Sequence, residues 1–435
     1  MPTVTFLESG GDATQDQSFW PLGWNSSSPG NEGSDGNGAL TLDSSQSHTG
    51  SRSIKSTTTA TNSQAYVVTP NGVVVDAGAA ISFWVRFSTV SPSVKTSFCI
   101  LEQASDGPSV FGIGLNTNGT LGGGTSLSTG SNVNGSTTLS ATTWYRITIS
   151  YFITSVSNWA AKVYINGVLE FTMNNLVNSN LFGSMGTTGC VVFGQDNIGT
   201  AFPNGAIMSV WFDDIYIDNR TDQSDPGNIS VTAKRPFANG TTNGFSTTGT
   251  PSGYGSGHAS YVNGNYPVGS DTTTYVSVVV IASAITEEFN IEGSTVGDVS
   301  LSGATIKGVQ GWIFASSTLT ETDKILVDGT QTSISVTSTP TLFTQNSPNP
   351  TTYPAGTGTD IGMVTNTTAA TAKLFGAGIL IAYIPGATTT GTFSVSDAAG
   401  TASWVSGIVP PYVAEPLGDL RPAPFLPGSP PSFRV

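Results

Sequence analysis

Short runs in which apolar and polar residues alternate recur along this chain, and they restrict its fold more than any other feature. In residues 80–87 every second side chain is apolar, namely Ile81, Phe83, Val85 and Phe87. A strand places such residues on one face, where they can be buried against a second sheet. Gly, Pro, Asn and β-branched residues interrupt every window that could form an amphipathic helix. The pattern predicts an all-β protein.

A strong turn signal lies between two of these runs. The pair Asn166–Gly167 separates residues 161–165 from residues 168–171. Asn and Gly both tolerate the positive φ that the two central positions of a tight hairpin require. Residues 144–152 alternate in the same way, and residues 210–218 close the series. The first half of the chain is therefore predicted to be a series of antiparallel strands.

The chain divides into three predicted parts. The polar stretch 219–227 ends in Pro-Gly and separates the first series of strands from a second series. In that second series, residues 374–384 are predicted to form a buried central strand. Repeated prolines after residue 410 favour an extended segment without its own core. We predict a jelly-roll β-sandwich, a second β-sandwich and an extended Pro-rich arm, at residues 1–221, 222–409 and 410–435.

The chain is acidic but carries few charges of either sign. Charged residues make up 10% of the sequence, with 14 Lys and Arg against 28 Asp and Glu. Nucleic-acid binding needs clustered cations, and anionic membranes repel an acidic surface, so we expect neither partner. We expect no secretory signal in residues 1–17, because they lack a basic and an apolar region. The uncharged polar surface is typical of virion proteins and of secreted adhesive proteins.

No local residue pattern indicates a catalytic site. The chain has two histidines, His48 and His258, and we expect neither to lie near an acidic cluster. Retaining glycoside hydrolysis needs two carboxylates about 5 Å apart, often at alternate positions of one strand. Glu287 and Glu288 are adjacent, so a strand would point them to opposite faces. We therefore predict that the protein is not an enzyme.

The two cysteines, Cys99 and Cys190, lie in strand-like runs. We expect buried free thiols, which pack as small hydrophobic groups. A disulfide between them is the alternative. Two thiols without a nearby His are a poor metal site.

Several motifs of the first half follow one another in an order that resembles the laminin-G-like or concanavalin-like jelly-roll family. The resemblance covers residues 4–219 and is carried by Phe6–Gly10, Gly50–Lys55, Phe83–Phe87, Thr143–Ile147, Val163–Gly167 and Trp211–Ile217. It implies a sandwich whose last strand returns beside the first. It also implies that the domain binds sugars or proteins.

The same resemblance implies two candidate metal ligands. Some carbohydrate-binding jelly rolls hold a structural calcium with a carboxylate of the closing strand and the Glu of the opening strand, and Asp214 and Glu8 match these positions. Calcium needs further oxygen ligands, and a hydrogen-bonded carboxylate at a strand end is the alternative. We expect Asp213 and Asp214 to face opposite sides of their strand. Calcium is the one cofactor that the resemblance implies.

Sugar binding would use exposed aromatic side chains that stack on pyranose faces. Trp20, Trp24 and Trp159 lie in loop-like or irregular segments and are the candidates. The alternative is that these tryptophans fill the edges of the sandwich, because Trp is usually well buried.

Residues 229–384 resemble a recurrent module of uncharacterised tailed-phage structural proteins. The resemblance is carried by Lys234–Phe245, Asp271–Tyr275, Ser294–Gly297 and Ile306–Trp312. It implies a location in the virion and carries no assigned biochemical role.

Together these observations predict a bacteriophage virion structural protein exposed on the particle surface, as a capsid decoration, head fibre or tail-associated protein with glycan-binding capacity. Its expected partners are other virion proteins, further copies of itself (a trimer by analogy) and cell-surface glycans. The alternative is a secreted bacterial carbohydrate-binding or adhesive protein.

The Pro-rich arm generates a testable prediction. It carries the apolar anchors Tyr412, Leu417, Leu420, Phe425 and Phe433. Such anchors stabilise a docked segment by roughly 1.5–3 kcal/mol each when fully buried, and prolines reduce the entropy lost on docking. We predict that deleting the residues after Tyr412 leaves both sandwiches folded but lowers oligomer stability or incorporation into particles, measured by sedimentation and particle assembly. Full assembly of the truncated chain would show that the arm has no docking role.

Overall fold

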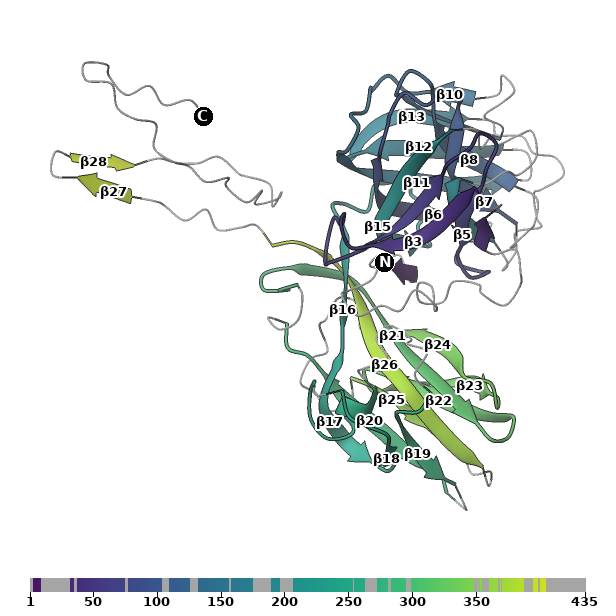
Figure 1. Cartoon of the computed structure of the whole chain (residues 1–435), viewed down its shortest axis with the longest axis vertical. Helices are drawn as coiled ribbons and strands as arrows, with labels where there is room; N and C mark the ends of the chain where they lie inside the picture. Colours follow the sequence, from purple (N-terminus) through teal and green to yellow (C-terminus); the bar gives the residue numbers. More distant parts are fainter. Residues whose placement is uncertain are drawn as a thin grey trace. The chain divides into compact units, whose positions relative to one another are not determined.

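The structure is a computed structural model of the whole chain in which strands predominate (Figure 1). It describes residues 3–8, 32–34, 37–74, 77–103, 109–125, 132–155, 158–174, 189–195, 206–252, 254–262, 272–280, 283–294, 299–347, 351, 353, 360–366, 368, 370–386, 394–397 and 400–403. The chain separates into two compact units, Met1–Gly386 and Ala387–Val435. The predicted all-β class is confirmed.

An eight-stranded antiparallel sheet forms one layer of the N-terminal jelly roll, in the order β13-β12-β11-β6-β15-β4-β3 with β1 also paired to β15. Its strands are β1 (Val4–Glu8), β3 (Gly38–Asp43), β4 (Ser53–Thr58), β6 (Gly78–Phe87), β11 (Trp144–Ser155), β12 (Asn158–Ile165), β13 (Val168–Asn174) and β15 (Met208–Asp218). The last strand thus returns beside the first, as the family resemblance implies.

A seven-stranded sheet forms the other layer, in the order β10-β9-β8-β7-β14-β5-β2. Its strands are β2 (Glu32–Ser34), β5 (Ala65–Val68), β7 (Thr96–Glu102), β8 (Ser109–Leu115), β9 (Leu121–Gly124), β10 (Asn132–Asn134) and β14 (Cys190–Gln195). All neighbouring strands of this sheet run antiparallel.

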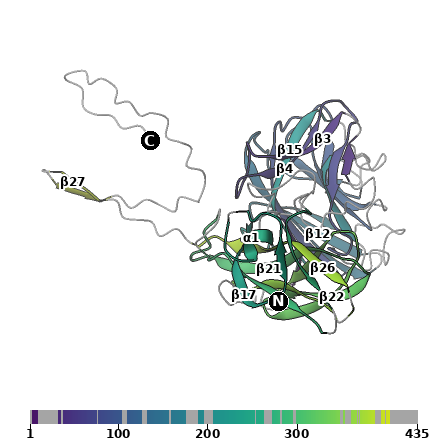
Figure 2. The same cartoon turned by 60° about the horizontal axis from the view of Figure 1, so that its bottom comes forward.

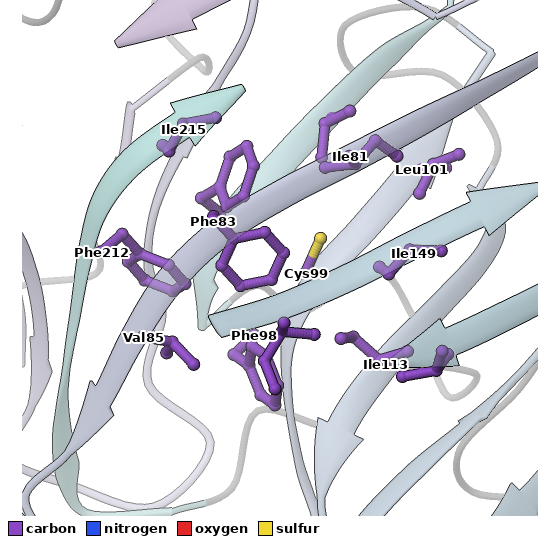
Figure 3. Close-up of a cluster of buried hydrophobic side chains, with 14 of the residues drawn as sticks. Ile81, Phe83, Val85, Phe98, Cys99, Leu101, Ile113, Ile149, Phe212 and Ile215 are labelled. Atoms are coloured by element: carbon purple, nitrogen blue, oxygen red, sulfur yellow. The ribbon is translucent and has the colours of Figure 1, made fainter. Parts of the chain in front are cut away.

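The core between the two layers is apolar and rich in phenylalanine. The four alternating side chains of β6, which include Phe83 and Phe87, are all buried in it. Figure 3 shows Phe83, Phe98 and Phe212 gathered there, with the ring centre of Phe83 6.5 Å from that of Phe98 and 6.0 Å from that of Phe212. Cys99 and Cys190 are buried free thiols, as predicted.

The predicted hairpin joins β12 and β13. Asn166 and Gly167 have φ angles of 50° and 86°. Both turn residues are therefore in the left-handed region that a two-residue hairpin of this kind needs, and the prediction is confirmed.

A second β-sandwich follows, and it contains a six-stranded and a five-stranded sheet. The six-stranded sheet contains β16 (Ser230–Lys234), β18 (Ser246–Thr248), β19 (Tyr275–Val279), β21 (Thr305–Ser317), β24 (Thr341–Asn346) and β26 (Thr371–Ile384). The five-stranded sheet contains β17 (Pro236–Asn243), β20 (Thr286–Ile291), β22 (Glu321–Val327), β23 (Thr330–Val336) and β25 (Ile361–Val364). As predicted, β26 is a buried central strand, since it pairs with β16, β19 and β21.

Three short elements complete the description. Helix α1 (Ala259–Val262) packs beside β17 in the second sandwich (Figure 2). In the other unit, β27 (Ser394–Asp397) and β28 (Gly400–Ser403) form a hairpin. No helix among the described residues is long and apolar enough to span a membrane.

The arm at residues 410–435, with its anchors, lies outside the described residues. The three domain boundaries stay a prediction.

The jelly roll and the second sandwich share a small apolar cluster. It joins three residues of the first sandwich, Val4, Leu7 and Tyr216, to residues of the second, among them Val231 and Trp312. The side-chain amide of Asn346 also donates to the backbone oxygen of Val4, over 2.6 Å. These contacts lie within the compact unit Met1–Gly386, which contains both sandwiches.

Residues 219–227, predicted to be a boundary, are held against the eight-stranded sheet. Arg146 on β11 forms a bidentate ion pair with Asp225, with N–O distances of 2.5 and 2.8 Å. The hydroxyl of Tyr164 on β12 donates to the backbone oxygen of Gln223 over 2.7 Å. These contacts attach the stretch to the sheet. We call residues 219–227 the strap.

The strap generates a stability prediction. Arg146 is 4% exposed, so Asp225→Ala leaves its guanidinium buried without a carboxylate partner. We expect the full chain to lose about 3 kcal/mol of unfolding free energy, the lower end for a buried pair that loses one member. Denaturant unfolding measures this loss.

The control is Asp222→Ala in the same strap. The carboxylate of Asp222 accepts hydrogen bonds from Ser224 in an exposed turn, so its removal should cost about 1 kcal/mol, the net value of a typical hydrogen bond. Equal losses for the two variants would show that the ion pair does not hold the strap.

Candidate functional site

One cross-strand row of tryptophans and cations crosses the outer face of the eight-stranded sheet. Trp144 pairs with Arg86, Arg86 pairs with Trp211, and Trp211 pairs with Lys55 in the registers of β11, β6, β15 and β4. Directly paired residues of neighbouring strands point to the same face. We call these four residues the tryptophan–cation row.

The outer face of the other sheet is different in chemistry. Its apolar cluster contains Val68, Ile100, Cys190 and Val192, and all four are buried. The tryptophan–cation row instead combines aromatic rings with charged groups, and Trp144, Arg86 and Lys55 are half-buried. The row is therefore the better candidate for contact with a polar ligand.

Trp211 holds the two cations of the row. The Lys55 Nζ atom lies 5.2 Å from the Trp211 ring centre, and the Arg86 guanidinium carbon lies 5.8 Å from it. The indole N–H of Trp211 donates to the Asp43 Oδ2 atom over 2.8 Å, and Lys55 Nζ lies 3.3 Å from the same oxygen. Cation–π attraction and the Asp43 contacts thus orient Arg86 and Lys55 over one ring.

Asp43 is ionised throughout the neutral range. Burial opposes its ionisation, but hydrogen bonds from Ser45, Trp211 and Lys55 outweigh this effect and lower its pKa to about 2. Because the folded-state pKa is depressed, the stabilisation is present above pH 4 or so and is lost as the pH falls toward 2. Asp43, which binds Trp211 and Lys55 of the row, therefore keeps its negative charge at physiological pH.

A histidine borders the row on one side. The His48 ring stacks on Trp84, with ring centres 3.6 Å apart and an interplanar angle of 14°. The His48 ring also packs edge to face against Trp144, with ring centres 6.0 Å apart. The Trp84 indole N–H donates to the backbone oxygen of Ile229, over 3.2 Å. Three aromatic rings therefore meet where the segment before β16 begins to cover the sheet.

A β-bulge in β15 directs two carboxylates to the same loop. Asp214 has a φ of 48°, and the pairing with β6 shifts between Asp213 and Tyr216. Asp213 Oδ2 accepts the backbone N–H groups of His48 and Thr49, over 2.6 and 3.1 Å. Asp214 Oδ2 lies 2.5 Å from the Nδ1 atom of His48 and accepts the Thr49 hydroxyl over 2.7 Å.

These contacts correct two predictions. Asp213 and Asp214 do not face opposite sides, because the positive φ of the bulge interrupts the alternation of the strand. Both histidines lie against a carboxylate: His48 against Asp214, and His258 against Glu287, with 2.7 Å between Nδ1 and Oε1. The sequence alone could not show these pairs, since their members lie far apart along the chain.

Asp213 is buried beside a second carboxylate. Burial raises its pKa well above the ordinary value, and the negative charge of Asp214 raises it further. The amide donors of His48 and Thr49 act in the opposite direction. Protonation of Asp213 is therefore coupled to the position of the β3–β4 loop.

The predicted calcium ligands lie on neighbouring strands. Glu8 is in register with Ile215, the residue after Asp214. The carboxylates of Glu8 and Asp214 are both buried. The Oδ1 atom of Asp214 accepts the Val231 N–H over 2.6 Å, so both of its oxygens are in hydrogen bonds, as the alternative interpretation holds. No group of three or more metal-ligating side chains that could hold an ion occurs in the described part of the chain. The calcium site stays a prediction.

The side chains of the predicted sugar-stacking residues lie outside the described structure, and Trp159 belongs to a strand and not, as predicted, to an irregular segment. Trp20 and Trp24 lie outside the described residues. Trp159 lies in β12, but its side chain is outside the described part. These three candidates stay predictions.

The tryptophan–cation row was missed from the sequence, although a signal for it exists. Three strands carry a tryptophan with a charged residue two positions later: Trp84 with Arg86, Trp144 with Arg146, and Trp211 with Asp213. Residues two apart in a strand share a face. A repeated pair of this kind in neighbouring strands predicts a polar aromatic surface.

Comparisons with known proteins agree with this fold. Residues 61–221 match the family model of the concanavalin A-like lectin/glucanases superfamily. None of the curated proteins matches the chain. Residues 61–221 therefore form part of a concanavalin-like jelly-roll domain, as their motifs indicated. The resemblance of residues 229–384 to phage proteins stays a prediction.

Solved structures with a similar fold include three carbohydrate-related proteins. One is an endo-β-1,4-glucuronan lyase from the fungus Trichoderma reesei, with 14% identity, coverage of 48% of this chain and 99% of that chain, and a TM-score of 0.34. Another is the cellulose induced protein Cip1, with 21% identity, coverage of 51% and 99%, and a TM-score of 0.35. A third is a conserved carbohydrate esterase from Shiga toxin-encoding bacteriophage phi24B, with 14% identity, coverage of 51% and 100%, and a TM-score of 0.35. Likeness at this level shows a shared fold alone.

The prediction that the protein is not an enzyme is corrected by these comparisons. It rested on the lack of a local catalytic pattern, yet the similar structures include a lyase and an esterase. One fold can host many unrelated functions, so the lack of a local catalytic pattern does not decide whether the protein is an enzyme. The fold is shared by enzymes and non-enzymes, and the residue pattern does not separate them.

The carboxylate pair of the bulge generates a pH prediction. Since the folded-state pKa of Asp213 is raised, its contribution to stability is greatest below its unfolded value and is lost as the pH rises through the folded value. We expect the unfolding free energy of the protein, relative to that of Asp213→Asn, to decrease as the pH rises from about 4. Denaturant unfolding over a pH series measures the difference.

Asp222→Asn is the control, because hydrogen bonds from Ser224 lower the pKa of Asp222. The protein should gain stability relative to this variant as the pH rises through the acid range. The same slope for both variants would contradict the assignment of a raised pKa to Asp213.

Proposed function

We propose that the jelly roll binds carbohydrate on the tryptophan–cation row. The observation that carries this proposal is the pairing of a half-buried indole, Trp144, with the guanidinium of Arg86 across two strands. An aromatic face packs against the C–H groups of a pyranose, while charged donors bind its hydroxyls. The row offers both kinds of group on one rigid sheet.

The parts of the row have separate roles in this proposal. Trp144 supplies the stacking surface, and its ring is oriented by the edge contact with His48. Arg86 and Lys55 donate hydrogen bonds to the ligand. Trp211 and Asp43 hold these two cations in position before the ligand arrives. Such preorganisation lowers the entropy lost on binding.

We further propose that the protein is exposed on the surface of a tailed-phage particle. Support comes from the resemblance of residues 229–384 to phage structural modules and from the low share of charged residues, 10%. Its partners there would be other virion proteins, copies of itself and glycans of the host surface. Mass spectrometry of purified particles tests this location, and a secreted adhesive protein would be found in the medium without particles.

Binding by the full chain tests the proposed site. We expect Trp144→Ala to weaken binding to any glycan found on an array by about tenfold, equal to 1.4 kcal/mol of stacking and contact energy. Titration calorimetry with the best glycan measures the change. The competing variant is Trp159→Ala, because Trp159 is the sugar-stacking candidate from the sequence that lies in the neighbouring strand β12.

The outcomes separate the alternatives. Loss of binding in Trp159→Ala with full binding in Trp144→Ala would contradict the assignment to the row. An array without any bound glycan would remove carbohydrate binding as the function of this domain.

A further inference from the structure

Two of the few cations of this acidic chain lie together in the tryptophan–cation row. The sequence has 14 Lys and Arg against 28 Asp and Glu. Even so, Arg86 and Lys55 lie over the ring of Trp211. A chain with this balance has enough carboxylates to neutralise each cation. An arginine that lacks a carboxylate partner is therefore informative.

Other arginines of the sheet and its strap have carboxylate partners. Arg146 is paired with Asp225, and Arg220 is paired with Asp218 at 2.5 Å. Arg86, in contrast, forms no ion pair within the described residues, and its Nε atom is buried there without a hydrogen-bond acceptor. The carboxylate whose charge acts on Arg86, Asp43, is bound by Lys55, Trp211 and Ser45.

An unused donor on a charged group costs free energy when water is excluded from it. Burial lowers the pKa of Arg86, because it removes part of the water around the guanidinium. The charge of Asp43 acts in the opposite direction. Arg86 as a whole is only half-buried, so the terminal nitrogens of its planar guanidinium are the donors that can bind a carboxylate through two parallel hydrogen bonds.

We infer that the row binds an acidic saccharide, and that Arg86 recognises the carboxylate of its uronate units. Side chains paired directly across two strands have Cβ atoms about 4.5–5.5 Å apart. One sugar unit can therefore stack on Trp144 while its carboxylate reaches Arg86. Lys55 lies on the other side of Trp211 in the row and binds the same or the next acidic unit. This inference rests on the proposed carbohydrate binding and specifies its ligand class.

The test compares one oligosaccharide in two forms. The probes are a galacturonic acid hexamer and its methyl ester, which has the same rings without the negative charges. We expect the full chain to bind the acid at least tenfold more tightly than the ester in titration calorimetry. Arg86→Gln should remove this preference, and Arg86→Lys should retain part of it, because Lys keeps the charge but loses the bidentate geometry.

Lys324→Gln is the control for the general effect of charge. Lys324 is an exposed residue of the second sandwich, where it donates to Gln331, and its loss should leave the preference unchanged. Thermal unfolding of each variant confirms that the fold is retained. A sulfated neutral glucan is a further probe, and binding as tight as that of the uronate would overturn recognition of the carboxylate.

The outcomes distinguish this inference from the proposed function. Equal binding of acid and ester, lost in Trp144→Ala and kept in Arg86→Gln, would overturn the acidic ligand and leave the carbohydrate site in place. Acid binding that neither variant changes would overturn the assignment of both residues. No binding of either hexamer would overturn the inference, and an array of neutral glycans that is also blank would overturn the proposed function.

Discussion

The bulge that carries Asp213 and Asp214 is the feature on which the arrangement of the N-terminal sandwich depends. Before the bulge β15 pairs with β4, and after it β15 pairs with β1. The two carboxylates bind the β3–β4 loop at this change of partner and also reach Val231 of β16. Burial of two adjacent carboxylates is costly unless donors surround them, and here the backbone and His48 supply these donors. One irregular position thus joins the strands, the loop and the start of the second sandwich.

Local features of the fold could be predicted from the sequence, whereas the site could not. The alternation in β6 and the turn at Asn166–Gly167 follow from neighbouring residues, so they were predicted correctly. The row depends on register between strands that are far apart along the chain, and Asp225 lies 79 residues from Arg146. A polar stretch such as 219–227 looks like a linker until its partners are known. The bulge at Asp214 could not be located from the sequence, because Asp tolerates a positive φ better than most residues but does not require it.

Fold and function are connected here through the outer face of a sheet. The core faces of the strands contribute most of the stability. Residues 219–227 and Ile229 cover part of the outer face of β4, β6, β11 and β15, and the tryptophan–cation row lies on the same outer face. Aromatic rings on this face fix the positions of flexible cations, which otherwise lose side-chain entropy on binding. The row is therefore rigid, although it is built from long side chains. A binding surface on strands needs no loop rearrangement to receive its ligand.

The strap formed by residues 219–227 has a consequence for avidity. Asp225 and Gln223 attach this segment to β11 and β12, so the chain leaves the sheet at a defined position before the second sandwich begins. In an oligomer whose domains are held in fixed positions, copies of the row would keep a constant spacing. Multivalent binding to a polymer gains several orders of magnitude only when the spacing of sites matches that of the repeats. A stiff joint would make the assembled protein selective for the periodicity of a polysaccharide, a property that one isolated copy does not have.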